Sequence, residues 1–113
     1  MTDITFPRAT RAHLERRAAL TPEPEAAFRA FSSAVFAEGA LDPRVKQLIA
    51  VAVAHVTQCP WCLEGHVRAA RREGASDAQI MEAIWVAAEM RAGAAVAHSV
   101  KALDLLGTQE PPR

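Results

Sequence analysis

Apolar side chains recur along this chain at helical spacings, and β-branched residues never cluster in strict apolar and polar alternation. This pattern favours helices. A first helix is expected over about residues 9–20, rich in Arg and Glu and only weakly amphipathic. Thr21-Pro22-Glu23-Pro24 ends it, and a second helix is expected over about residues 24–38. Gly39 is predicted to close the second helix in a left-handed conformation. The inner side of this second helix carries Phe28, Phe31, Val35 and Phe36.

A third helix has a clear beginning, because Asp42 is a good N-cap residue and Pro43 suits the first helical position. Residues 48–54 are apolar all round, which predicts a central helix buried on every side. This helix is expected to end near Thr57 or Gln58. Pro60 cannot lie inside a continuing helix without the loss of a hydrogen bond.

The fourth and fifth helices are marked by their first residues. Pro60 opens the fourth, which makes Cys59 its N-cap residue, and Gly74 ends it. Ser76 and Gln79 match a capping box, which opens the fifth helix. That helix has a wide apolar face, formed by Ile80, Met81, Ile84, Trp85, Ala87 and Ala88.

A sixth helix is predicted near the C-terminus, separated from the fifth by an interruption at Gly93 and stopping at Gly107. Its apolar positions are Val96, Val100, Leu103 and Leu106. The chain is therefore expected to form a single all-α domain over residues 1–113, a compact bundle of about six helices. Its alanine-lined faces favour close packing between helices and against copies of the same chain.

The composition excludes several classes of protein and gives no support for binding to nucleic acid or membranes. Half of the 113 residues are hydrophobic, which excludes an intrinsically disordered chain. Thirteen basic and thirteen acidic side chains balance, so no overall charge favours nucleic acid or an anionic membrane. The longest apolar run, Leu48 to Ala54, is far shorter than the roughly 20 residues of a membrane span. The first residues do not resemble a signal peptide, so a cytoplasmic protein is expected.

The two cysteines form one motif, Cys59-Pro60-Trp61-Cys62. A close pair in a reducing compartment is typical of redox or metal chemistry. At the N-cap and third positions of one helix, the two sulfurs should lie near each other. Unpaired amides and the helix dipole stabilise an anion there, so an activated dithiol is predicted.

Two histidines flank this motif at helical spacing. His66 follows Cys62 by four residues, which places the imidazole beside the sulfur, where it can accept and return the thiol proton. The alternative for His66 is a surface histidine without a partner. His55 precedes Cys59 by four residues and either joins the polar cluster or only caps the end of its own helix.

Zinc is the rival chemistry, because His55, Cys59, Cys62 and His66 are all possible ligands. The spacing argues against it, since three of the four would lie on one short helix, whereas tetrahedral sites usually join separate elements. A covalent c-type haem is excluded because Leu63, and not histidine, follows Cys62. No metal and no cofactor is therefore expected.

Together these residues resemble a known family. The segment from Lys46 to His55, the Cys59-Pro60-Trp61-Cys62 motif with His66, and residues 83–95 resemble the carboxymuconolactone decarboxylase superfamily, especially its alkylhydroperoxidase D-like branch. The resemblance implies an all-α fold that assembles into homotrimers or homohexamers. It also implies a redox-active dithiol that reduces hydroperoxides or exchanges disulfides, with a protein or lipoyl-type electron donor. By this resemblance Cys62 attacks the peroxide and Cys59 resolves, although the cap geometry also allows Cys59 to be the more acidic sulfur.

One position departs from the family pattern. The peroxidase branch carries a glutamate of a proton relay twelve residues before the first motif cysteine, where this chain has Gln47. An amide can hydrogen-bond, but it cannot accept a proton at neutral pH. Glu64 or Glu38 could substitute in principle, although nothing in the sequence places them at the site.

Two functional hypotheses follow. The first is a dithiol oxidoreductase that reduces hydroperoxides and serves antioxidant defence. The second is a non-catalytic helical oligomer whose dithiol is a redox sensor or is silent, as the exchange to Gln47 suggests. A decarboxylase-like activity ranks below both, because that reaction needs no dithiol.

Overall fold

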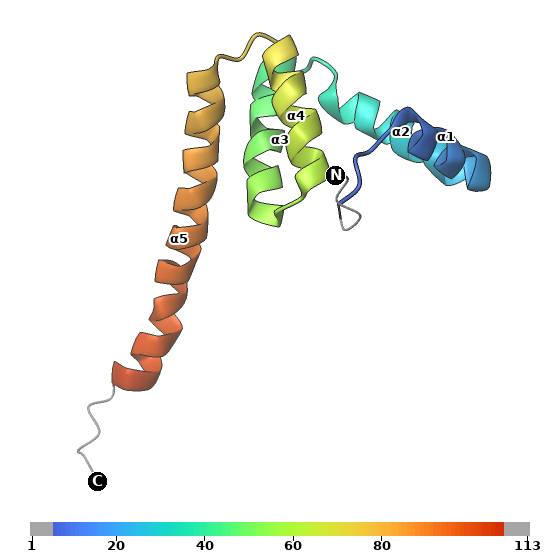
Figure 1. Ribbon diagram of the computed structural model, residues 1–113. Helices are drawn as coiled ribbons and strands as arrows, with labels where there is room; N and C mark the ends of the chain where they lie inside the picture. Colours follow the sequence, from blue (N-terminus) through green and yellow to red (C-terminus); the bar gives the residue numbers. More distant parts are fainter. Residues whose placement is uncertain (1–5, 108–113) are drawn as a thin grey trace.

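The computed structural model describes residues 6–107, which form five α-helices and no strand (Figure 1). The all-α prediction is confirmed, whereas the predicted number of about six helices is not. The helices are α1 (Arg11–Leu20), α2 (Pro22–Phe36), α3 (Pro43–Thr57), α4 (Pro60–Arg72) and α5 (Asp77–Gly107).

The core lies where α3, α4 and the first half of α5 meet. α3 packs against both α4 and α5, which contact each other much less. Small side chains allow the close approach, because Val51 and Ala70 are completely buried and Ala75 and Ile80 nearly so. The prediction that α3 is buried on every side is wrong for the single chain. Ile49 and Val53 are about half exposed, because no helix covers their side.

Most helix ends follow local rules. The Asp42 carboxylate accepts from the Val45 amide at 2.9 Å, and Ser76 and Gln79 form the expected capping box. Gln58 adopts the left-handed conformation that ends α3. These boundaries were readable because each depends on only a few neighbouring residues.

The end of α2 differs from the prediction, because Gly39 does not form a left-handed cap there. The helix ends at Phe36, and Ala37 continues in extended conformation. The Lys46 ammonium donates to the carbonyl oxygens of Val35 and Ala37 at 2.8 and 2.5 Å. In a glycine cap, backbone N–H groups would hydrogen-bond to the last carbonyl groups of the helix. Here a lysine from the next helix does so instead.

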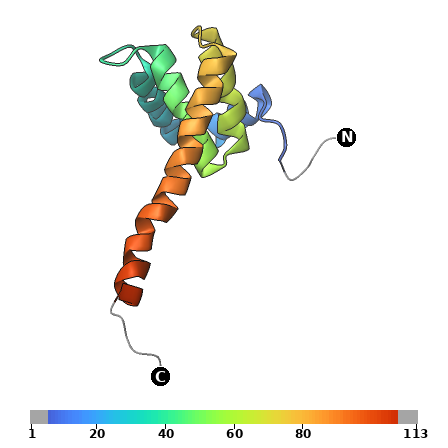
Figure 2. The same ribbon diagram turned by 90° about the vertical axis from the view of Figure 1, so that its left-hand side faces the viewer.

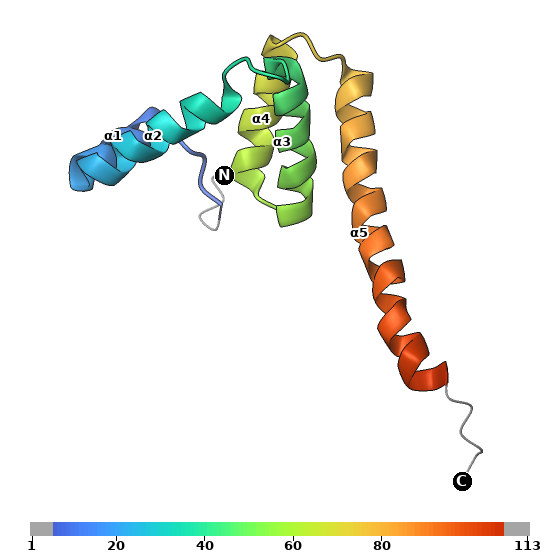
Figure 3. The ribbon, with the colours of Figure 1, turned by 180° about the vertical axis from the view of Figure 1, so that it is seen from behind.

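The expected break at Gly93 is also absent, so the predicted fifth and sixth helices are one long helix, α5. A single glycine costs a helix only about 1 kcal/mol, and the alanines on both sides favour continuation. Figures 2 and 3 show the second half of α5 projecting beyond the other helices. The radius of gyration is 20.2 Å, against about 13 Å for a compact domain of this length. The chain alone is therefore elongated, contrary to the compact bundle expected.

The helices α1 and α2 form a hairpin that no buried apolar side chain of α1 supports. An ion pair joins them instead. Nε and Nη2 of Arg17 donate to the two oxygens of the Glu25 carboxylate, at 2.7 and 2.9 Å, and only 7% of Glu25 is exposed. Hydrogen bonding to Arg17 holds the pKa of Glu25 below its ordinary value. The end of α2 reaches α4 through Phe36, which stacks on His66. Within residues 6–107, no helix has the length and apolarity needed to cross a bilayer.

Candidate functional site: a dithiol between two cavities

The start of α4 brings the two cysteines together. Cys59 is the N-cap residue, and its sulfur accepts from the backbone N–H of Cys62 at 3.3 Å. The two Sγ atoms are hydrogen-bonded at 2.6 Å, and both cysteines are free thiols. The predicted cap arrangement is confirmed, and it places the sulfurs where a disulfide can form with little movement of the backbone.

The two thiols differ in acidity. The side chain and the backbone of Cys62 both hydrogen-bond to the Cys59 sulfur, and these contacts lower the pKa of Cys59. The same side-chain hydrogen bond raises the pKa of Cys62, and burial adds to the rise. Cys59 is therefore the first thiol to ionise, and Cys62 ionises only at higher pH.

His66 is well placed to be a base, because Gln47 and Phe36 fix its ring. Its Nδ1 lies 2.7 Å from Oε1 of Gln47, and Phe36 stacks on the ring at 5.2 Å. With the amide oxygen facing the ring, Nδ1 carries the proton and Nε2 keeps a lone pair. Burial lowers the pKa of His66, so the imidazole is neutral at pH 7.

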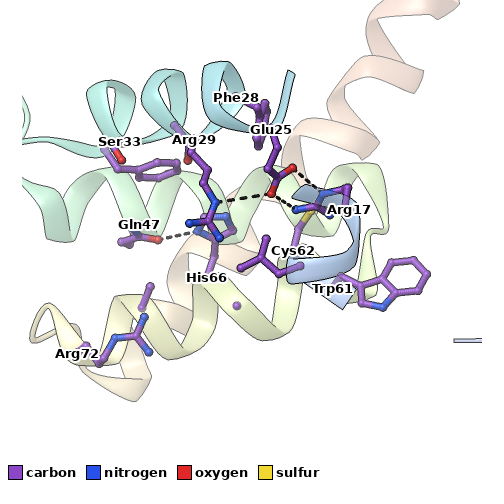
Figure 4. Close-up of a pocket in the computed structure, with 15 residues that line it drawn as sticks. Arg17, Glu25, Phe28, Arg29, Ser33, Gln47, Trp61, Cys62, His66 and Arg72 are labelled. Atoms are coloured by element: carbon purple, nitrogen blue, oxygen red, sulfur yellow. Dashed lines mark hydrogen bonds and ion pairs between the residues drawn. The ribbon is translucent and has the colours of Figure 1, made fainter. Parts of the chain in front are cut away.

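A cavity of about 630 Å³, here called the arginine cavity, brings three predicted residues together (Figure 4). Cys62, His66 and Gln47 all border it; helical spacing suggested that His66 lies beside Cys62, and the family resemblance suggested Gln47. The Cys62 thiol and the His66 ring share this cavity without a hydrogen bond between them in the described part of the chain. Four charged residues missed by the sequence analysis also border it, namely Arg17, Glu25, Arg29 and Arg72.

No local sequence signal marks these four residues, because three of them come from the hairpin of α1 and α2. Only the packing of the hairpin beside α4 brings them to Cys62. Arg72 lies at the end of α4, six residues or about 1.7 turns beyond His66.

A second cavity, of about 450 Å³, also touches Cys62 and His66 and is here called the aliphatic cavity. It lies between α2 and α3, and α3 contributes most of its wall. Its other lining residues are Val35, Phe36, Leu41, Lys46, Ile49, Ala50, Val53, Ala54 and Thr57. Cys62 and His66 therefore lie between the arginine cavity, which has charged walls, and the aliphatic cavity, which is mostly apolar.

His55 does not join this group. Its Nδ1 lies 2.7 Å from the carbonyl oxygen of Val51, and it borders a separate cavity of about 520 Å³ with Cys59. Phe6, Pro60 and Leu63 make most of that space, here called the His55 cavity, apolar. The dithiol therefore has two sides, with Cys62 at the arginine cavity and Cys59 at the His55 cavity.

The alternative carboxylates and the metal ligands can also be located. Glu64 pairs with Arg68 and Arg8, at 3.0 and 3.5 Å, and borders none of these cavities, and neither does Glu38. No three His, Cys, Asp or Glu side chains within residues 6–107 gather closely enough to hold a metal ion. The carboxylate that does reach the arginine cavity is Glu25.

Comparison with known proteins identifies the family. A family model described as carboxymuconolactone decarboxylase matches residues 22–105. This chain belongs to the carboxymuconolactone decarboxylase family. The matched part of this family member includes Cys59, Cys62, His66 and Gln47, whereas Arg17 lies before it.

Individual relatives resemble this chain in sequence or in fold. A Paracoccus denitrificans protein, known only as uncharacterised protein 4 in the cox locus, is 65% identical over 106 residues, 94% of this chain and 95% of the relative. A solved structure from Methanobacterium thermoautotrophicum has a TM-score of 0.69 at 35% identity, covering 79% of this chain and 96% of that one. A Thermotoga maritima family member with a suggested role in antioxidative response has a TM-score of 0.62 at 24% identity, covering 86% and 91%, and shows the fold alone.

The order of acidity can be tested by alkylation. In the reduced protein, iodoacetamide should modify Cys59 first, with a midpoint pH below the roughly 8.5 of an ordinary thiol. Cys62 should follow only at higher pH, because its pKa is raised. Peptide mass spectrometry after short pulses between pH 5 and 10 measures both. Exposure alone would favour Cys62, so modification of Cys62 first would contradict the assignment.

Proposed function

We propose that this family member is a dithiol hydroperoxide reductase of the alkylhydroperoxidase D-like kind, acting in antioxidant defence. The observation that carries the proposal is the pair of Sγ atoms 2.6 Å apart at the edge of a cavity that a neutral His66 also borders. A dithiol that must be free to react suits a reducing compartment, which supports a cytoplasmic location.

The chemistry begins with Cys62, the thiol at the arginine cavity. His66 takes the Cys62 proton, and the thiolate attacks the outer oxygen of the hydroperoxide. The O–O bond breaks, Cys62 becomes a sulfenic acid, and the alkoxide takes the proton from His66 to leave as an alcohol. The Cys59 thiolate then attacks the Cys62 sulfur, and hydroxide leaves as water after taking a solvent proton. The hydroperoxide is reduced to alcohol and water, and the dithiol is oxidised to a disulfide.

An external dithiol must restore the reduced form. Its thiolate attacks the disulfide, and its second thiol releases the enzyme dithiol while the donor becomes a disulfide. The His55 cavity supports a lipoyl-type donor, because it is mostly apolar and Cys59 borders it. Donor and hydroperoxide would then approach different sulfurs from different sides.

The second candidate function is a redox-sensing or silent helical oligomer. Gln47 favours it, because the amide that holds His66 cannot take part in proton transfer. The reductase and the redox sensor both predict a disulfide, so only turnover separates them.

Turnover is tested with the two cysteine variants. With cumene hydroperoxide and dihydrolipoamide, the wild type should oxidise the donor continuously, and Cys59→Ser and Cys62→Ser should both fall to the background rate. Mass spectrometry of oxidised wild type should show the loss of two hydrogens, restored by dithiothreitol. His98→Gln is the matched control, because among residues 6–107 the His98 side chain hydrogen-bonds to the Ala94 carbonyl of its own helix and to no other group. A disulfide without turnover against several donors would support the sensor and contradict the reductase.

The role of Gln47 is tested by Gln47→Glu. A carboxylate facing Nδ1 would make His66 a stronger base, and general-base assistance is typically worth about 10²–10⁴-fold in rate. Turnover should therefore rise at least about tenfold, although the added charge would also raise the pKa of the nearby thiol and offset part of the gain. Rates measured from pH 6 to 9 decide the matter. Equal rates over that range would show that Gln47 plays no part in proton transfer.

The exposed apolar surface supports assembly into homotrimers or homohexamers. The projecting half of α5 leaves Val96, Val100 and Leu103 60–70% exposed. The accessible surface of the chain is 9262 Å², against about 6,100 Å² for a compact monomer of 12.2 kDa. Copies of the same chain would bury the excess.

Assembly is tested by light scattering at micromolar concentration. The wild type should show three or six times the mass of one chain, and Leu103→Asp should shift it toward the monomer, because a buried unpaired charge is costly. The control Asp104→Asn changes a neighbouring residue without adding charge to the apolar stripe. A monomeric wild type would contradict the prediction.

A further inference from the structure

The arginine cavity carries more positive than negative charge. Three guanidinium groups, from Arg17, Arg29 and Arg72, border it with a single carboxylate, that of Glu25, so two positive charges (three minus one) remain. Arg17 occupies both carboxylate oxygens at 2.7 and 2.9 Å, whereas Arg29 lies 3.6 Å from one of them. Arg72 has no ion pair within residues 6–107. Donors of Arg29 and Arg72 therefore remain available to a ligand.

Arg72 borders the same cavity as the Cys62 sulfur. Cys62, His66 and Arg72 all border the cavity from α4, with Gly65 and Ala69 between them. Ten residues separate Cys62 from Arg72, about 15 Å along the helix, and an arginine side chain spans part of that distance. A Cβ added at Gly65 would meet nothing within 4 Å, so this stretch of α4 is open. A molecule of moderate length can thus reach both Cys62 and Arg72.

Apolar side chains form much of the remaining wall, beside Ser32, Ser33 and Gln47. Leu14, Phe28, Phe36 and Trp61 border the same cavity, and they come from α1, α2 and α4. Figure 4 shows Arg29 extending from α2 toward the part of the cavity where Gln47 and His66 lie. The cavity therefore offers a hydrocarbon body an apolar wall and offers an anionic end two guanidinium groups.

We propose that this cavity selects hydroperoxides of apolar carboxylic acids, with Arg29 and Arg72 binding the carboxylate while the peroxide group faces Cys62. The inference rests on the proposed reductase function for the reaction and on the charge and shape of the cavity for the substrate class. Glu25 is a positioning residue in this scheme, because it holds the hairpin through Arg17 and keeps Arg29 at the cavity.

Binding is tested first, without any reaction. Calorimetry with the reduced protein compares 4-isopropylbenzoate with 4-isopropylbenzamide, its neutral isostere. The acid should bind about tenfold more tightly, because a hydrogen bond to a charged group is stronger than one to a neutral group. Arg72→Gln should remove the preference. Arg71→Gln should keep it, because Arg71 does not border the cavity and lies 3.8 Å from Asp77. Equal binding of acid and amide, or equal losses in both variants, would overturn the proposal.

Kinetics then separate this proposal from the reductase function. The value of kcat/KM for 4-carboxycumene hydroperoxide divided by that for cumene hydroperoxide should fall about tenfold in Arg72→Gln and stay constant in Arg71→Gln. Turnover of both peroxides with no preference for the acid would overturn the carboxylate site and leave the reductase function standing. A binding preference for the acid with no turnover of either peroxide would support the site and contradict the reductase.

Discussion

The pairing of the Cys59 and Cys62 thiols depends on a break in the backbone hydrogen bonding at Pro60. Proline has no amide hydrogen, so α3 cannot run on into α4, and Gln58 turns the chain in a left-handed conformation. The first amides of α4 are therefore left without carbonyl partners. The Cys59 sulfur accepts a hydrogen bond from one of them, the backbone N–H of Cys62. That contact brings the two sulfurs together, and the side chain and backbone of Cys62 together make Cys59 the more acidic thiol. A cap that in most helices only stabilises the fold here also lowers the pKa of a thiol.

The second constraint is the ion pair that holds the N-terminal hairpin. The helix α1 buries no residue, so Arg17 and Glu25 replace the apolar contacts that usually join two helices. The hairpin contacts the rest of the chain through Phe36 on His66 and through Lys46 on the carbonyl groups at the end of α2. Because these contacts stand beside the dithiol, the hairpin is also a wall of the site. Its charged residues border the same cavity as Cys62 for the same reason.

The small core explains the extended shape. Val51, Ala70 and their neighbours bury little surface, and much of the apolar side of α5 lies beyond the reach of the other helices. A chain of this length has enough apolar residues for a compact domain, yet it distributes them over faces that it cannot cover alone. Such a distribution favours partners of the same sequence, since complementary apolar stripes then recur in every copy.

The sequence by itself determined the all-α class, the boundaries of α3 and α4, and the cap that pairs Cys59 with Cys62, because each follows from interactions within a few residues. It also placed His66 and Gln47 near Cys62, since helical spacing and the family resemblance both pointed there. It failed at the end of α2, where Lys46 replaces a glycine cap, and at Gly93, where the surrounding alanines continue the helix. Only the tertiary structure separated His55 from His66 and brought Glu25, Arg29 and Arg72 to the cavity. The places of Glu25 and Arg29 depend on where the hairpin lies relative to α4, and no local pattern of residues encodes contacts between side chains so far apart in the chain.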